Sequence, residues 1–172
     1  DVALEWAKSG TFGFQTLFEE IICIVSGYGD VRNVTVTSDL DGRDNWEEIC
    51  KLDPVGTPDA TTNYPVFNYA LSYGTTAGLI GTDYVNGWYV PSVAELIEIS
   101  INKDVIQKSL TVARGFIFGS DFYWSSSQTN DDYFGTSAGI VIFDDTGNHD
   151  SVSNYTKDAD AFVFVLHDLN AE

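Results

Sequence analysis

The apolar residues of this chain change their spacing at Gly115, and this change constrains the fold more than any other feature of the sequence. Before Gly115 they recur at the intervals of amphipathic helices. After it they form short β-type runs, separated by polar stretches rich in Asp, Asn, Ser and Gly. The runs are Phe122–Ser126, Gly139–Phe143 and Ala161–His167. Helices followed by strands predict an α+β fold with a mainly antiparallel sheet.

The first part of the chain contains several helix signals and two strand signals. An apolar stripe from Phe14 to Val25 predicts one helix, since its members recur every three or four residues. Ser or Asp followed three residues later by Glu or Gln marks the start of other helices. These helices are expected at 45–52 after Asp44 with Glu47, from 93 after Ser92 with Glu95, and from Asp104 with Gln107 to Gly115, and the apolar spacing after Pro65 indicates one more at 66–73. The segments 31–37 and 88–90 are expected to be strands.

The length of 172 residues predicts a single domain. Pro, Gly, Thr and Asp are concentrated between Asp53 and Asn63, which indicates a loop or an internal boundary. We therefore expect residues 1–62 to form a helix and strand lead-in packed on the same domain, and residues 63–172 to form its core. The first residue is Asp1, from which we expect a processed or excised piece of a longer protein.

The charge of the chain excludes some classes of partner. Its 26 acidic and 8 basic side chains give a formal net charge of −18. Such a field repels phosphate backbones and anionic lipid headgroups, so we expect no nucleic-acid partner. No apolar run approaches the roughly 20 residues of a membrane span, so we expect no direct membrane insertion.

Two motifs resemble reactive or metal-binding sites, and both have a simpler interpretation. Gly135–Gly139 matches the G-x-S-x-G nucleophile elbow with Ser137 at its centre, but a loop precedes it and a strand is expected to follow, which reverses the required context. The stretch with Asp39, Asp41 and Asp44 resembles a calcium loop. We favour an Asp-Gly turn and a helix cap there, and therefore expect no cofactor; calcium at these three aspartates is the alternative.

The cysteines and histidines give no clear metal site. Cys23 and Cys50 are too few for a four-thiolate zinc site, and their spacing leaves open whether they form one disulfide or two buried thiols. His149 and His167 have no metal-ligand neighbour four residues on, so surface histidines are the default interpretation.

Two motifs together resemble a bacterial surface family typified by the C-terminal domain of the Legionella collagen-like adhesin. The family pattern is a G-W-x-L-P-[ST]-x-x-E-L segment, then Y-W-S-S-[ST], then a strand, a Gly-containing turn and a closing apolar strand. The matching residues are Gly87-Trp88, Pro91-Ser92, Glu95-Leu96, Tyr123-Trp124-Ser125-Ser126, Ile140–Phe143 with Gly147, and Phe162–Leu166.

The resemblance implies a C-type-lectin-like fold, with helices flanking a twisted sheet and long polar loops on one side. It implies an extracellular or surface-anchored bacterial module for adhesion or ligand binding. Some members are display proteins diversified by retroelements, which is the alternative function. Phe162–His167 lacks the arginines usual in the family's closing strand, so an arginine-based anion site is not expected. The calcium-dependent sugar triplets of true C-type lectins are also absent from the sequence.

We therefore expect a non-catalytic module that recognises a host or neighbouring-cell protein or glycan through the loops after Trp124 and Phe143. A hydrolase is the less favoured reading. Loops on a rigid scaffold are where recognition residues concentrate, and we assign Trp88 and Trp124 to the core of that scaffold, where they hold the sheet. The predicted ligand-binding residues are Gln128, Asn130, Asp131, Asp132, Tyr133, Phe134, Asn148, His149, Asn154, Tyr155 and Lys157.

Overall fold

The computed structural model describes residues 2–27, 29–114, 118–130, 134–146 and 149–170. The helices are α1 (Phe12–Gln15), α2 (Asn45–Leu52), α3 (Ala60–Asn63), α4 (Pro65–Thr76), α5 (Val93–Ile101) and α6 (Lys103–Arg114), with 3-10 turns η1 (Glu19–Ile21), η2 (Val31–Asn33) and η3 (Thr57–Asp59). The strands are β1 (Ala3–Glu5), β2 (Ile22–Ser26), β3 (Gly29–Asp30), β4 (Thr35–Thr37), β5 (Trp88–Tyr89), β6 (Asp121–Trp124), β7 (Gln128–Thr129), β8 (Ser137–Phe143), β9 (Ser151–Thr156), β10 (Asp160–Val163) and β11 (Leu166–His167).

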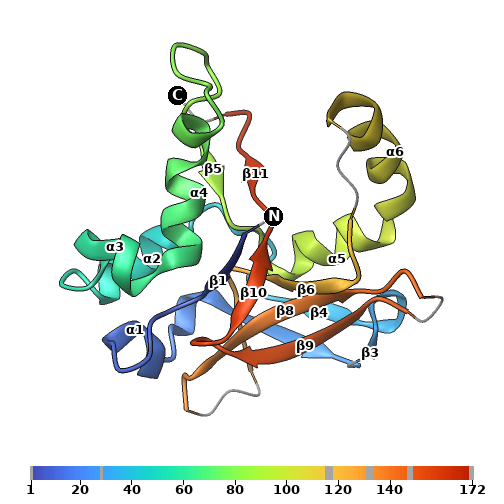
Figure 1. Cartoon of the computed structure of the whole chain (residues 1–172). Helices are drawn as coiled ribbons and strands as arrows, with labels where there is room; N and C mark the ends of the chain where they lie inside the picture. The colour runs from blue at the N-terminus through green and yellow to red at the C-terminus, as the bar shows by residue number, and fades with distance from the viewer. Residues whose placement is uncertain (1, 28, 115–117, 131–133, 147–148, 171–172) are drawn as a thin grey trace.

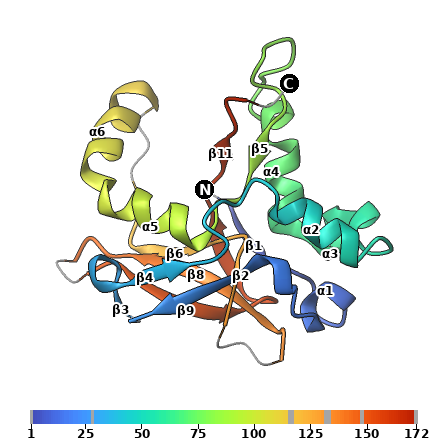
Figure 2. The same ribbon diagram turned by 180° about the vertical axis from the view of Figure 1, so that it is seen from behind.

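The main sheet has the strand order β1-β10-β6-β8-β9-β3. Its strands are antiparallel except for the parallel pair of β10 and β6. A smaller sheet has the order β4-β2-β7, and β11 pairs with β5. The helices α2 to α4 stand on one side of the β5–β11 pair, and α5 and α6 stand on the other (Figures 1 and 2). The predicted α+β class with a mainly antiparallel sheet is thereby confirmed.

Strand β8 separates two hydrophobic clusters. Ile140 belongs to the cluster that contains Trp6, whereas Val141 and Phe143 belong to the cluster beneath α5. Successive side chains of a strand point to opposite faces of the sheet, so β8 is covered on both faces. This double burial explains the nearly unbroken apolar run of β8 in the sequence.

The N-terminal segment is built into the same sheets as the rest of the chain. β1 pairs with β10, β3 pairs with β9, and β2 lies parallel to β7. The indole Nε1 of Trp6 donates to the backbone oxygen of Ser125 at 2.9 Å, and that of Trp124 donates to the backbone oxygen of Leu4 at 2.7 Å. The segments before and after the boundary expected near residue 62 therefore contribute strands to the same sheets.

The helix predicted from Phe14 to Val25 is wrong. The chain forms the short helix α1, the turn η1 and then strand β2. Ile21, Cys23 and Val25 are buried while Ile24 and Ser26 are exposed, so this segment also carries the alternation of a strand. The β-branched run favours the extended form, and pairing with both β4 and β7 stabilises it.

Some of the other local predictions are confirmed and others are wrong. The helices at 45–52 and 66–73 are confirmed as α2 and α4, and the capping box of Ser92 with Glu95 is complete at the start of α5. Asp44 makes no side-chain capping hydrogen bond, and Asp104 lies inside α6 rather than before it. Within the predicted strand 31–37, only Thr35–Thr37 forms a strand, because residues 31–33 form the turn η2, which the Asp30 side chain caps.

The two tryptophans assigned to the scaffold have different environments. Trp124 is fully buried, as predicted. Trp88 is half-buried in β5, away from the main sheet, where its ring lies 4.6 Å from that of Tyr73 and 5.0 Å from that of His167. Its assignment to the core is therefore wrong. In the part of the chain that the structure describes, no helix has the length and apolar character required to cross a membrane.

Candidate functional site

The segment after Trp124 turns inward instead of forming a loop toward solvent. Ser125, Ser126, Ser127, Gln128 and Thr129 are all fully buried. The Gln128 side chain accepts a hydrogen bond from the Phe18 backbone N–H at 2.7 Å and donates to the Ser137 backbone oxygen at 3.1 Å. Its prediction as a ligand contact is wrong, because its amide satisfies buried backbone groups.

Beyond Gln128, the structure describes two of the predicted binding residues of this segment, Asn130 and Phe134. Asn130 is exposed, and its side-chain oxygen accepts from the Val25 N–H at 3.1 Å. Phe134 is 83% exposed. Asp131, Asp132 and Tyr133 lie outside the described residues.

The region predicted as one long loop after Phe143 contains the strand β9. Asn154 and Tyr155 belong to this strand, opposite Gly139 and Ala138, and the Tyr155 ring packs 5.8 Å from that of Trp124. Lys157 is fully buried. The assignment of these three residues to a recognition loop is wrong, because Asn154 and Tyr155 pair with β8 and Lys157, in the turn after β9, is buried. In the Asp144–Asp150 connection, the described residues 144–146 and 149–150 belong to no strand; Asn148 lies outside the described residues.

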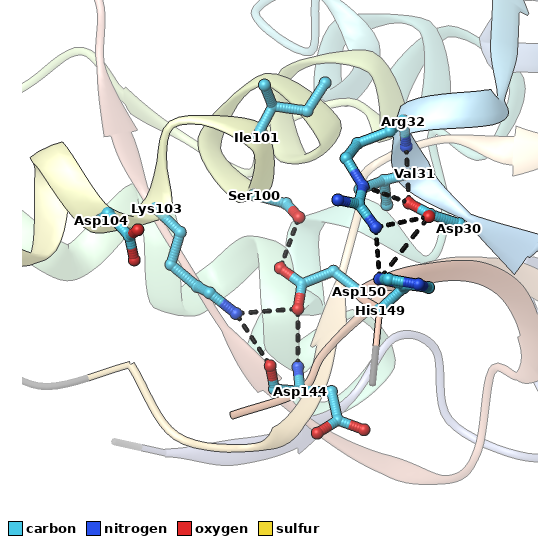
Figure 3. Close-up of a pocket in the computed structure, with 10 residues that line it drawn as sticks. All are labelled: Asp30, Val31, Arg32, Ser100, Ile101, Lys103, Asp104, Asp144, His149 and Asp150. Atoms are coloured by element: carbon cyan, nitrogen blue, oxygen red, sulfur yellow. Dashed lines mark hydrogen bonds and ion pairs between the residues drawn. The ribbon is translucent and has the colours of Figure 1, made fainter. Parts of the chain in front are cut away.

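This connection forms one wall of a charged pocket with a volume of about 320 Å³. The end of β3 and the turn η2 form a second wall, and the junction between α5 and α6 forms a third (Figure 3). His149 is the predicted binding residue that lies in this pocket. The remaining polar lining residues are Asp30, Arg32, Ser100, Lys103, Asp104, Asp144 and Asp150.

Asp150 holds the connection against the helices. Its carboxylate is nearly buried and accepts hydrogen bonds from the Ser100 hydroxyl at 2.6 Å, the Lys103 ammonium at 2.8 Å and the Asp144 backbone N–H at 2.8 Å. Lys103 also donates to the Asp144 backbone oxygen at 3.1 Å. Figure 3 shows Asp150 at the centre of these contacts. Charge-assisted hydrogen bonds of this kind hold Asp144 and Asp150 against the two helices.

Asp30 and Arg32 form the opposite wall. The guanidinium donates through Nε and Nη2 to the two carboxylate oxygens at 2.9 and 2.7 Å, and the Arg32 backbone N–H donates at 3.0 Å. These bonds lower the pKa of Asp30 to about 2. The imidazole of His149 contacts the Arg32 guanidinium, and its Nδ1 lies 3.7 Å from Asp30. The side chain of His149 is 61% exposed, so it forms the outer edge of the pocket.

The buried charges of the pocket are paired with one another. The carboxylates of Asp30 and Asp150 form ion pairs with Arg32 and Lys103, respectively. Ser100 is buried, and its hydroxyl donates a hydrogen bond to Asp150. Among the described residues, no group of three metal-ligating side chains is placed to bind a metal ion. What faces outward is the imidazole of His149 and the exposed carboxylate of Asp104.

Sequence reasoning found His149 but missed most of its neighbours. Asp30, Ser100 and Lys103 come from segments far apart in the chain, and no local spacing relates them to Asp150. Asp30 carried one local signal, since an Asp two residues before a turn N–H is typical of a turn cap.

The three aspartates considered for calcium are used differently. Asp41 forms an ion pair with Arg43, and Asp44 is exposed. Asp39 accepts hydrogen bonds from the Asn45 amide at 3.1 Å and from Ser127. Ser38 and Asp39 have positive φ angles of 61° and 42°, a left-handed turn that directs Asp39 inward. Burial raises the pKa of Asp39 to about 7, although its hydrogen bonds oppose the shift.

The raised pKa of Asp39 predicts a pH-dependent stability. Burial disfavours the charged form of the Asp39 carboxyl group in the folded chain. The stability that this group contributes is therefore greatest near or below its ordinary pKa of 3.8 and is lost as the pH rises toward 7. Relative to Asp39→Asn, the wild type should lose about 2 kcal/mol of unfolding free energy between about pH 5 and about pH 8. Urea unfolding at both pH values measures this difference. The exposed control Asp83→Asn should behave as the wild type, and equal pH dependence in Asp39→Asn would contradict the assignment.

The two motifs left open by the sequence also have structural outcomes. Cys23 is a buried free thiol in β2, and Cys50 is a half-buried free thiol in α2, so they do not form a disulfide. Burial raises the pKa of Cys23 to about 12. Ser137 is the first residue of β8 and therefore lacks the strand–turn–helix setting of a nucleophile elbow.

The chain was compared with known proteins. Searches against models of protein families, against curated proteins and against solved structures each found no match.

Proposed function

We propose that this chain is a non-catalytic ligand-binding module with a C-type-lectin-like fold, working outside the cell or at its surface. Its partner, a protein or a glycan, is held at the pocket beside the Asp144–Asp150 connection. The observation that carries this proposal is the Asp150 network, which holds Asp144 and Asp150 against two helices before any ligand arrives. Residues that are already held in place lose less entropy when a ligand binds.

The distribution of burial also supports this location. The segment after Trp124 is turned into the core, whereas His149 and Asp104 face solvent at the pocket. Both side chains offer hydrogen-bonding groups that no core contact requires.

Binding to glycan and protein arrays tests the proposal. We expect a retained partner whose signal falls at least about tenfold in His149→Ala and in Asp104→Asn, because each removes a group at the mouth of the pocket. Asp59→Asn is a matched control, since Asp59 is an exposed carboxylate in η3, outside the pocket. A partner that binds both pocket variants as well as the wild type would contradict the proposal.

A further inference from the structure

An apolar groove lies beside the pocket, between strand β4 and helix α5. Its volume is about 610 Å³. The apolar side chains that define it are Val34, Val36, Leu40, Ile97, Ile101 and Leu166. Leu40 is 58% exposed and Ile101 is 50% exposed. Side chains of this kind lose contact with water only if something covers the groove.

The groove and the pocket form one continuous surface. Val31, Arg32 and Ile101 line both of them. A ligand seated in the pocket therefore extends naturally along α5 over the apolar side chains. The ligand that fills both has a polar end and an apolar body.

Strand β4 offers backbone hydrogen bonds along this groove. Among the described residues, β4 pairs with β2 and is the edge strand of its sheet. Val36 faces the groove while Thr35 and Thr37 are exposed. An extended peptide can add to such an edge, with every second side chain directed into the groove. The geometry favours a strand-like segment over a compact ligand.

The charges beside the groove indicate the polar residues of this segment. Glu98 and Asp104 are exposed, and no hydrogen bond or ion pair among the described residues engages either carboxylate. Glu95, by contrast, already accepts from the Tyr89 hydroxyl and from two backbone N–H groups. The cation of Arg32 is paired with Asp30. The charged groups beside the groove that are left for a partner are therefore carboxylates, in a chain of net charge −18.

We propose that this surface binds an extended segment of a partner protein whose groove-facing residues are apolar, with lysine or arginine at the groove-facing positions nearest Glu98 and Asp104. The inference rests on the proposed function, and it names the partner of that site. Apolar side chains fill the groove, backbone groups pair with β4, and the basic side chains meet Glu98 and Asp104.

Panning a phage-displayed library of random seven-residue peptides on the full chain tests the proposal. We expect enrichment of valine, isoleucine, leucine or phenylalanine together with lysine or arginine. The affinity of the most enriched peptide, measured by fluorescence anisotropy, should fall at least about tenfold in the double variant Leu40→Ser with Ile101→Ser, a change of about 1.4 kcal/mol. Glu98→Gln should weaken it less, and mainly at low salt.

The control is Leu71→Ser on α4, because Leu71 is 52% exposed and lies outside the groove. Since Leu40 and Ile101 are similarly exposed, circular dichroism should show that all three variants remain folded. No enrichment, enrichment of acidic peptides, or equal binding by the double variant would overturn the inference. An array partner that is lost in His149→Ala but kept in the double variant would overturn this inference and leave the proposed function standing.

Discussion

Replacing Trp6 by alanine should lower the free energy of unfolding by about 3–5 kcal/mol, the cost of removing a large buried aromatic side chain. Trp6 has no exposed surface. Its ring lies 5.0 Å from that of Phe67 and 6.2 Å from that of Phe18, and its indole N–H donates to Ser125. Loss of the ring therefore opens a cavity and leaves a buried carbonyl without its donor. Urea unfolding followed by circular dichroism measures the change.

Two further variants separate these contributions. Trp6→Phe keeps much of the apolar volume but loses the hydrogen bond to Ser125, so about 1–3 kcal/mol should be lost. Phe12→Ala is the matched surface control, because Phe12 is 54% exposed. If Trp6→Ala proved no more destabilising than Phe12→Ala, the role of Trp6 in the core would be refuted.

Replacing Lys157 by alanine should cost about 3 kcal/mol of unfolding free energy. The Lys157 ammonium is fully buried and donates to the backbone oxygens of Gly13 and Thr16, at 2.8 Å each. It also lies 4.6 Å from the centre of the Trp6 ring and 5.2 Å from that of Phe18. Without it, two buried carbonyls lose a charged donor and the aromatic pair loses a cation.

The variant Lys157→Met tests whether the donor or the volume matters. Methionine refills the space of the lysine stem but donates nothing, so most of the loss, about 2 kcal/mol, should remain. Lys51→Ala, at a lysine whose side chain is 63% exposed, should change stability by less than about 0.5 kcal/mol. Full stability in Lys157→Met would show that the hydrogen bonds to Gly13 and Thr16 contribute nothing.

The elements that local signals specify were predictable from the sequence. Helix α5 is one, because within one turn the Ser92 hydroxyl accepts a hydrogen bond from the Glu95 backbone N–H and the Glu95 carboxylate accepts one from the Ser92 backbone N–H. β2 is the opposite case. Its residues fit both a helical and an alternating pattern, and pairing with β7, more than a hundred residues further on, selects the strand.

The site was less predictable than the fold for a related reason. Polar residue types were interpreted as exposed, but Gln128 and Lys157 are fully buried because they satisfy backbone groups of the N-terminal segment. The charged groups of the pocket, such as Asp30 and Lys103, come together only through the tertiary fold. Only His149, next to the buried Asp150, was identified from the chain alone.

The register that places Ala3 opposite Phe162 has a consequence for the order of events in folding. Pairing between positions so distant in the chain closes a very long loop, and proteins dominated by such contacts fold slowly. During synthesis, the first strand must wait, unpaired, until β10 has left the ribosome. Newly made chains therefore expose the unpaired edge of β1 until β10 has been synthesised, the period in which a chaperone would protect them best.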